Sequence, residues 1–198
     1  RQRTAMYVSE RERAELRTRT GDLGEYLASL GVYATIHPMR EAELPRVAQL
    51  FSKTNQFNLT TRRLSEEQLR VLAQGPESAV FTMTAGDRFG DLGLIAALVA
   101  RRDGDRGTID ALLMSCRALG RRLEHALVDH GLLSLERQWG VQEWYAEYIA
   151  TRKNGQVERF WDDVGFEPVR TSPAGRVYRL EVTRRSRPKL DFIAIKGS

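Results

Sequence analysis

The order of apolar and polar segments predicts an α+β domain with a mixed central sheet flanked by helices. Three observations carry this prediction. One strand pattern is followed by two amphipathic helix patterns, and three strand patterns joined by short Gly-containing turns come next. Helix and strand patterns then alternate to the end of the chain. The most apolar stretch, residues 109–116, leads into a helix pattern at a turn that contains Gly120.

Local signals mark the first strand and the first two helices. Residues 33–37 form a short run that a proline stops, which predicts a strand. Apolar residues at spacings of three, three and one predict a helix over 41–53. Ser65 stands three residues before Gln68, which is a capping box, and Gly75 ends the helix that this box begins.

The strands that follow are richer in apolar residues. Residues 78–85 and 92–100 predict two strands, and residues 109–116 predict a third, buried one. The next helix is expected to end near Gly131. Its apolar stripe consists of Leu119, Leu123, Ala126 and Leu127.

Three elements complete the predicted domain. Residues 141–149 mix aromatic and acidic side chains and predict a strand. Residues 155–164 predict a short helix, because Gly165 and a proline soon after it stop the pattern. Alternation over residues 177–182 predicts the closing strand.

The net charge of +5 is carried by the two ends of the chain. Residues 1–20 hold six Arg and three Glu, and residues 183–198 hold five Lys and Arg and one Asp, which leaves residues 21–182 at −2. Because basic ends are more often solvated or interdomain segments than nucleic-acid sites, we expect no nucleic-acid partner. We expect a helical N-terminal extension or connector over 1–31, one domain over 32–182 and a basic C-terminal tail after it.

Composition narrows the setting of the protein. The hydrophobic fraction of 41% is ordinary, and no apolar run reaches the roughly 18 residues that suggest a membrane span. We therefore expect no membrane partner. A single cysteine and a charged N-terminus without an apolar signal core are typical of a cytoplasmic, reducing setting. The three histidines have no metal-ligand spacing, so no metal is expected.

The turn around Gly120 is unusually basic. Arg117, Arg121 and Arg122 flank the glycine, and Cys116 precedes it. Arginines in a first helical turn oppose the helix dipole, so this composition favours an anion bound to the exposed amides. The turn therefore predicts a phosphate or pyrophosphate site, although ordinary surface pairing explains the arginines equally well. Gly120 would meet a demand for close ligand approach or tight helix packing.

The element order and the Arg-x-x-Gly turn resemble the GNAT superfamily of N-acyltransferases, over residues 32–182. The resemblance implies the GNAT fold, with turn amides that hold the pyrophosphate of coenzyme A and a pantetheine arm that runs between splayed strands. It places cofactor binding at Arg117, Leu119, Gly120, Arg121, Arg122 and Asn154. For Asn154, an N-cap of the short helix remains an alternative.

Separated motifs more closely resemble the C-terminal half of FkbH-like proteins of polyketide pathways. That resemblance implies transfer of a glyceryl group, as a thioester, to the phosphopantetheine arm of an acyl carrier protein. Complete members also carry a haloacid-dehalogenase-like phosphatase domain, which would need an early Asp-x-Asp signature after a strand, and none occurs near the start of this sequence. The resemblance implies such a domain as a partner. The shared motifs are 54–63 (Thr-Asn-Gln-Phe-Asn-Leu-Thr-Thr-Arg-Arg), 87–91 (Asp-Arg-Phe-Gly-Asp), Ile109-Asp110, 113–117 (Leu-Met-Ser-Cys-Arg), Gly120-Arg121 and Lys153-Asn154.

Two departures from the GNAT pattern argue against ordinary acetyl-coenzyme A chemistry. Arg122 stands where the turn usually has Gly or Ala, so either its guanidinium binds phosphate or the pyrophosphate site is degraded. Trp161 stands where many acetyltransferases have a tyrosine that protonates the leaving thiolate, and an indole cannot supply that proton. A carrier arm has one phosphate where coenzyme A has a pyrophosphate, so a modified turn fits a carrier better.

Candidate catalytic residues are Cys116 and Asp110. Cys116 follows a strand among arginines, a setting that favours the nucleophilic thiolate, although a lone cysteine is often a small buried hydrophobe. Asp110 is expected on the same strand face as Cys116, as a base or a ligand for acyl hydroxyls, and a backbone hydrogen bond is the alternative. Candidate substrate or carrier contacts, for which loop capping is the alternative, are Asn55, Asn58, Thr60, Thr61 and Arg62.

The sequence thus favours an acyltransferase that moves a glyceryl-type group through Cys116. Two alternatives remain open: a module that docks a carrier protein without catalysis, and an N-acetyltransferase that uses acetyl-coenzyme A.

Overall fold

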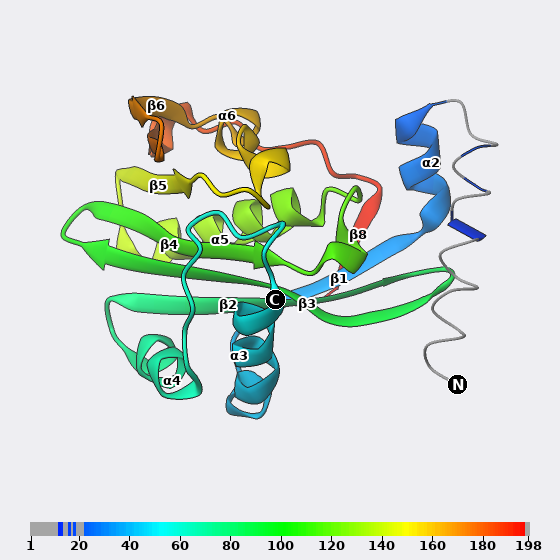
Figure 1. Ribbon diagram of the computed structural model, residues 1–198, viewed down its shortest axis with the longest axis horizontal. Helices are drawn as coiled ribbons and strands as arrows, with labels where there is room; N and C mark the ends of the chain where they lie inside the picture. The colour runs from blue at the N-terminus through cyan, green and yellow to red at the C-terminus, as the bar shows by residue number, and fades with distance from the viewer. Residues whose placement is uncertain (1–11, 14–15, 17, 19–21, 197–198) are drawn as a thin grey trace.

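The computed structural model describes residues 12, 13, 16, 18 and 22–196 (Figure 1). Eight strands form one sheet in the order β6-β7-β5-β4-β3-β2-β1-β8. The pairs β1/β8 and β4/β5 are parallel and the other pairs are antiparallel, which confirms the predicted mixed sheet of an α+β domain. The strands are β1 (Val32–Pro38), β2 (Ser78–Asp87), β3 (Gly90–Asp103), β4 (Arg106–Met114), β5 (Glu143–Ile149), β6 (Glu167–Ser172), β7 (Gly175–Glu181) and β8 (Ile193–Ile195).

Helices cover both faces of the sheet. Figure 1 shows α3 and α4 on one side and α5 and α6 on the other. The first layer packs Val47, Phe51 and Leu69 against β2, β3 and β4, and the second packs α2, α5 and α6 against the opposite face. The helices are α2 (Leu23–Leu30), α3 (Leu44–Lys53), α4 (Glu66–Gln74), α5 (Leu123–Trp139) and α6 (Phe160–Val164), with 3-10 turns η1 (Glu41–Glu43), η2 (Cys116–Ala118), η3 (Gly155–Val157) and η4 (Val182–Arg184).

The two parallel central strands separate along their length. Strand β4 pairs with β5 only from Arg106 to Ile109, opposite Glu143 to Ala146. Beyond these residues β4 continues to Met114 and β5 to Ile149 without direct pairing. A gap therefore opens between the carboxyl ends of β4 and β5.

Helix α5 corrects the sequence prediction at both ends. It begins at Leu123, so Leu119 lies outside it, and it continues past Gly131 to Trp139. Leu132, Leu135 and Trp139 continue the buried stripe, which outweighs the helix-breaking tendency of one glycine. A Cβ at Gly131 would lie 3.6 Å from the side chain of Leu98, so the helix packs closely on the sheet there.

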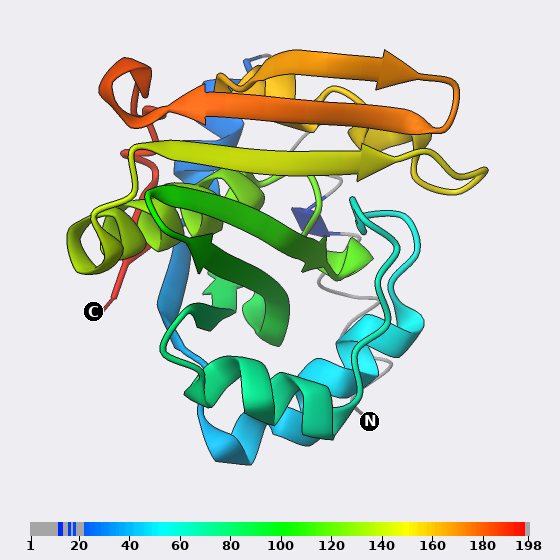
Figure 2. The ribbon, with the colours of Figure 1, turned by 90° about the vertical axis from the view of Figure 1, so that its left-hand side faces the viewer.

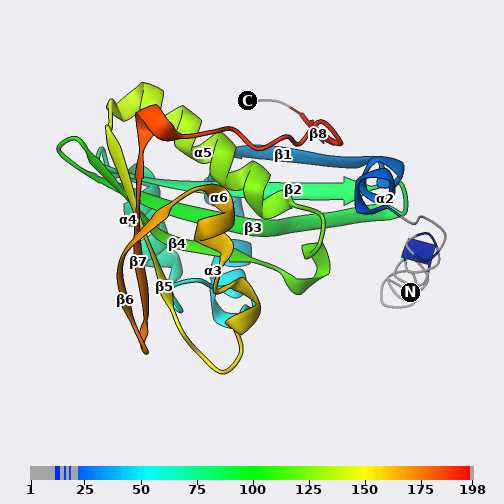
Figure 3. The ribbon, with the colours of Figure 1, turned by 90° about the horizontal axis from the view of Figure 1, so that it is seen from above.

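The C-terminal segment is part of the fold. Strand β8 pairs with β1, and Arg185 and Arg187 both form ion pairs with Asp129 of α5, each at 2.7 Å. Figure 3 shows this segment running along α5 to the edge of the sheet. The expected division at residue 182 therefore places the sheet's last strand outside the predicted domain. Strand β6 was also missed, because all six of its residues are exposed and show no apolar alternation.

The expected N-terminal extension lies largely outside the described residues. Of its described part, α2 buries Tyr26, Leu27 and Leu30 in the main core. No described helix is both long enough and apolar enough to span a bilayer.

Candidate functional site

An open cleft of about 980 Å³ lies between α3, the end of β4 and the connection from β5 to α6. None of the described residues that line it is acidic or histidine. Five cationic side chains therefore give the cleft a positive potential that favours an anionic ligand. They are Arg46, Lys53, Arg117, Arg152 and Lys153.

Cys116 lies in the wall of this cleft and is exposed. The alternative of a buried structural cysteine is therefore wrong. Strand β4 ends at Met114, and the amide of Ser115 donates to the carbonyl of Ile95 at 2.7 Å. Cys116 then begins the 3-10 turn η2, and both Cys116 and Arg117 of this turn line the cleft.

The turn from Cys116 to α5 differs from the expected first helical turn. The three arginines precede α5, and the charged residue in the helix's first turn is Glu124. Gly120 has φ 77° and Arg122 has φ 58°, both in the left-handed region. A Cβ at Gly120 would meet nothing within 4 Å, so its backbone dihedral, and not tight packing, requires glycine there.

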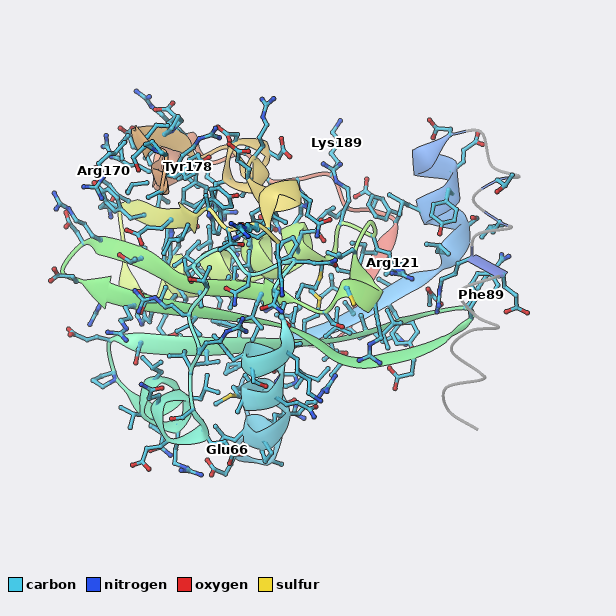
Figure 4. The ribbon with its side chains drawn as sticks, in the orientation of Figure 1. Glu66, Phe89, Arg121, Arg170, Tyr178 and Lys189 are labelled. Atoms are coloured by element: carbon cyan, nitrogen blue, oxygen red, sulfur yellow. The ribbon has the colours of Figure 1, made fainter. Side chains whose placement is uncertain are left out.

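Arg121 is buried and stabilises the turn. Its Nη1 donates to the carbonyl oxygens of Arg117 at 2.7 Å and Leu119 at 3.4 Å, and its Nε lies 3.5 Å from Asp87 Oδ2. Figure 4 labels Arg121 near the β2–β3 hairpin, which contains Asp87. Because this guanidinium is engaged within the fold, Arg121 is a poor candidate for a phosphate ligand.

The Asp87 carboxylate lies close to both Arg121 and Arg13. Arg13 donates to both of its carboxylate oxygens at 2.8 Å. Burial raises the pKa of Asp87, but the hydrogen bonds from Arg13 and from the Phe89 amide outweigh burial and hold the pKa below its ordinary value. The carboxylate thus fixes the hairpin, the Gly120 turn and a residue of the N-terminal segment together.

Of the remaining turn residues, two are exposed or lie beside the cleft. Arg117 lines the cleft, as a phosphate ligand would. Arg122 is exposed, and Leu119 has an extended backbone and packs partly buried against the main core. The turn therefore offers Arg117 and the open backbone at Gly120 to a ligand, and uses Arg121 and Leu119 for structure.

Asp110 does not share a strand face with Cys116, contrary to the sequence prediction. A bulge in β4 pairs Ala111 with Val99 and Ile109 with Ala100, which leaves Asp110 between them and breaks the two-residue period. The Asp110 carboxylate lies 2.5 Å from Arg101 and 3.8 Å from Arg62, and it does not line the cleft. A role as a base for Cys116 has no geometric support.

The chain itself fills the gap between β4 and β5. We call the buried segment Phe57–Thr60 the insert. The amide of Leu59 donates to Leu112 of β4 at 3.2 Å, and the amide of Ile149 of β5 donates to the carbonyl of Leu59 at 2.8 Å. The amide of Met114 donates to the carbonyl of Phe57 at 3.0 Å. Figure 2 shows the connection after α3 rising to the ends of these two strands.

Asn154 holds the insert against β5. Its Nδ2 donates to the carbonyls of Asn58 at 3.0 Å and Ile149 at 2.9 Å, and its Oδ1 accepts from the Thr151 amide at 2.8 Å. Burial raises the pKa of Tyr148, whose hydroxyl also donates to Asn154 Oδ1 at 3.3 Å. Asn154 occupies the predicted N-cap position before η3, but its side chain makes no cap hydrogen bond there. The side chain is fully buried and engaged with the insert and β5, so it presents no surface to a cofactor in this structure.

The five polar residues expected to contact substrate divide into two groups. Asn55 lines the cleft, and Asn58 and Thr61 line an adjoining pocket of about 290 Å³ that shares Thr54, Asn55, Arg152 and Lys153 with it. Thr60 and Arg62 face Asp110, since Thr60 Oγ1 donates to the Asp110 carbonyl at 2.9 Å. The sequence did not single out Arg46, Lys53 or Arg152, because scattered cations carry no motif.

Comparison with protein-family models finds no match, and comparison with curated proteins also finds none. Solved structures do match. The ribosomal-protein-S18-alanine N-acetyltransferase of Escherichia coli aligns over 75% of this chain and 94% of its own, with TM-score 0.57 and 18% identity. The GNAT domain of S. lividans PAT aligns over 74% and 89%, with TM-score 0.59 and 16% identity. The chain has the GNAT fold. A Thermoplasma acidophilum PaiA N-acetyltransferase in complex with coenzyme A aligns over 75% and 98%, with TM-score 0.56 and 12% identity.

This domain fits a pantetheine arm poorly at the position expected from the resemblance. The insert occupies the space between the splayed strands and uses their backbone groups. Trp161 is 1% exposed, and its indole donates to the Glu147 carbonyl at 3.1 Å, so it offers no proton to a thiolate in the cleft. Within the described part of the chain, no cluster of three His, Cys, Asp or Glu side chains could hold a metal ion.

Proposed function

We propose that this GNAT domain is an acyltransferase that carries an acyl group as a thioester on Cys116. The observation that carries the proposal is the exposed thiol in a cleft with five cationic side chains and no acidic one among its described lining residues. The Cys116 sulfur is a nucleophile that can form an acyl thioester, and five cations line the same cleft. These cations attract an anionic donor and acceptor.

The chemistry requires two exchanges at one sulfur atom. The Cys116 sulfur attacks the carbonyl carbon of an acyl phosphate or thioester, the new C–S bond forms, and the bond to the donor's phosphate oxygen or thiol sulfur breaks. A second thiolate then attacks the Cys116 thioester, takes the acyl group and releases the cysteine. Thioester exchange is nearly isoenergetic, so neither step needs an external energy source. The cations beside the cleft stabilise the negative charge that develops on the acyl oxygen.

A thiol acceptor with a nearby phosphate suits the cleft better than an amine does. An ammonium substrate would be repelled by Arg46, Lys53, Arg117, Arg152 and Lys153, and the described lining residues include no carboxylate or histidine to accept its proton. A phosphopantetheine thiol is anionic through its phosphate. We therefore propose an acyl carrier protein as acceptor and, from the FkbH-like motifs, a glyceryl-type acyl group that a phosphatase-like donor domain supplies.

A loading assay tests this function. The protein is incubated with a glyceryl donor and a phosphopantetheinylated carrier protein, and the acylated carrier is measured by mass spectrometry. Wild type and the charge control Lys189→Gln, which lies outside the cleft, are expected to load the carrier. Cys116→Ala is expected to lose at least 99% of loading. Full loading by Cys116→Ala would exclude the proposed intermediate.

A second candidate is an acetyl-coenzyme A-dependent N-acetyltransferase, which the structural neighbours favour because two of them are N-acetyltransferases. Acetylation of an amine without a carrier protein, at an undiminished rate in Cys116→Ala, would establish this candidate. A third candidate, carrier docking without catalysis, predicts carrier binding with no acyl group on Cys116. The loading assay, an amine-acetylation assay without carrier and a carrier-binding measurement together separate all three candidates.

A further inference from the structure

The gap between β4 and β5 is closed by protein backbone. The Leu112 carbonyl, the Met114 amide and the Ile149 amide point into this gap, and all three are hydrogen-bonded to the insert. Asn58 and Leu113 form an isolated antiparallel bridge, so the insert acts as a short extra strand between two parallel ones. A ligand lying between β4 and β5 would have to break these bonds and replace each of them.

The insert is also anchored by its side chains. Phe57, Leu59 and Thr60 are 3%, 0% and 4% exposed. The Phe57 ring packs edge-on against Phe160 of α6 with a centroid distance of 5.4 Å. Expelling the insert would expose both apolar side chains to water, which opposes displacement by a ligand.

Both ends of the insert are held by hydrogen bonds. The buried Asn154 amide binds the Asn58 carbonyl, and Thr60 Oγ1 binds the Asp110 carbonyl. Arg63 donates to the carbonyls of Phe51 and Thr54, which fixes the connection to α3. The insert is thus a built part of the domain and is held from α3, β4 and the β5–α6 connection.

A separate route leads to the thiol. Cys116 lines the cationic cleft beside α3, and Phe57 lines the same cleft, so the insert forms the wall between the cleft and the interstrand gap. We infer that the insert permanently closes the gap between β4 and β5, and that a phosphopantetheine-type thiol reaches Cys116 through the cationic cleft. The identity of the thiol rests on the proposed function; the closure of the gap does not.

A covalent probe tests the route without any acyl transfer. Cys116 is the only cysteine in the sequence, so phosphopantetheine disulfide labels the chain at one place. The Cys116 thiolate attacks one sulfur of the probe, a mixed disulfide forms, and one phosphopantetheine leaves as its thiol. Hydrogen exchange is then measured at the amides of Leu59, Met114 and Ile149, and compared with protein capped by a methylthio group on Cys116.

The expected result is exchange within twofold of the capped protein at all three amides. Exchange that is tenfold faster at these amides in the tethered protein would mean that the arm displaces the insert, and it would overturn the inference.

The rate of Cys116 labelling tests whether the lysines of the cleft attract the phosphorylated thiol. Lys53→Gln and Lys153→Gln are compared with Lys189→Gln, which is exposed and does not line the cleft. With the phosphorylated disulfide, each cleft variant is expected to label Cys116 at least threefold more slowly than the control, whereas neutral pantethine should label all three within twofold. Equal labelling of the three variants by the phosphorylated probe would overturn the cleft route. Neither measurement requires acylation, so failure of the loading assay would leave both results interpretable.

Discussion

At the scale of single residues, the setting of Cys116 is the basis of the proposed chemistry. The motif around the cysteine was visible in the sequence, and its exposure in the cleft agrees with a nucleophilic role. The partner expected for it, Asp110, is instead paired with Arg101. The sequence could not show this, because the bulge at Asp110 depends on how β3 pairs with β4.

Gly120 and Arg122 both have left-handed backbone conformations, and substitutions at these two residues are expected to change the stability of the fold in opposite directions. Gly120→Ala forces a Cβ into φ 77° and is expected to destabilise the fold by about 0.5–1 kcal/mol. Arg122→Gly relieves the cost at φ 58° and is expected to stabilise it by about 0.5 kcal/mol, since the relief exceeds the entropy that glycine adds to the unfolded chain. Urea midpoints measure both effects, and shifts in the same direction would contradict the backbone explanation.

At the scale of elements, the insert was the feature that the sequence described least well. The polar stretch 54–63 was recognised as dense in functional side chains, and substrate contact and loop capping remained equally open. The structure shows what several of these polar residues do: the Thr60 hydroxyl donates to the backbone of β4, and the Asn58 and Arg63 side chains donate to backbone carbonyls of the loop itself. The bonds from Thr60 to Asp110 and from Asn154 to Asn58 join residues that are 50 and 96 positions apart, so no local sequence pattern predicts them.

Asn154→Ala tests whether the hydrogen bonds of the Asn154 side chain stabilise the insert. The substitution leaves the Asn58 carbonyl and the Thr151 amide without their side-chain partner, and is expected to destabilise the fold by about 2 kcal/mol. Amide exchange at Leu59 and Ile149 should accelerate more than exchange in α5. The exposed Asn55→Ala serves as the control, with an expected change of less than about 0.5 kcal/mol. Unchanged stability of Asn154→Ala would show that these hydrogen bonds do not stabilise the fold.

At the scale of the whole molecule, the order of elements predicted the fold because strong apolar patterns define the central strands and helices. The two strands at the edges of the sheet, β6 and β8, were not predicted. Strand β6 is exposed throughout, and β8 joins the sheet through three residues and through the ion pairs of the preceding segment with α5. The ion pairs that hold the C-terminal segment join residues far apart in the sequence. The basic composition of this segment alone suggested a solvated tail.

The ion pairs between α5 and the C-terminal segment predict that the stability of the fold decreases at acidic pH. Burial raises the pKa of Asp129, but hydrogen bonds from Arg187 and Arg185 outweigh burial and hold the pKa below its ordinary value of 3.8. A carboxyl with a depressed folded pKa stabilises the fold above its unfolded pKa, and this stabilisation is lost as the pH falls further. Thermal unfolding from pH 6 to pH 2 should therefore show a shallower decline for Asp129→Asn than for wild type. An identical decline would contradict the role of this carboxylate.

His130 predicts a second, milder dependence at higher pH. Burial lowers the pKa of His130 below 6.5, because the neutral imidazole is favoured in the fold. Its contribution to stability is complete above pH 6.5 and is lost as the pH falls through the lower folded pKa. His130→Gln should therefore flatten the stability profile just below pH 6.5, whereas a steeper profile in the variant would contradict this assignment.

The central claim is that Cys116 carries the acyl group, and intact-mass analysis with a chase tests it most directly. The protein is exposed to the glyceryl donor alone, its mass is measured, and phosphopantetheinylated carrier protein is then added. We expect one adduct of the acyl mass on wild type, none on Cys116→Ser, and transfer of the adduct to the carrier when it is added. A fully loaded carrier without any adduct on wild-type Cys116 at any time would rule out Cys116 as the acyl carrier.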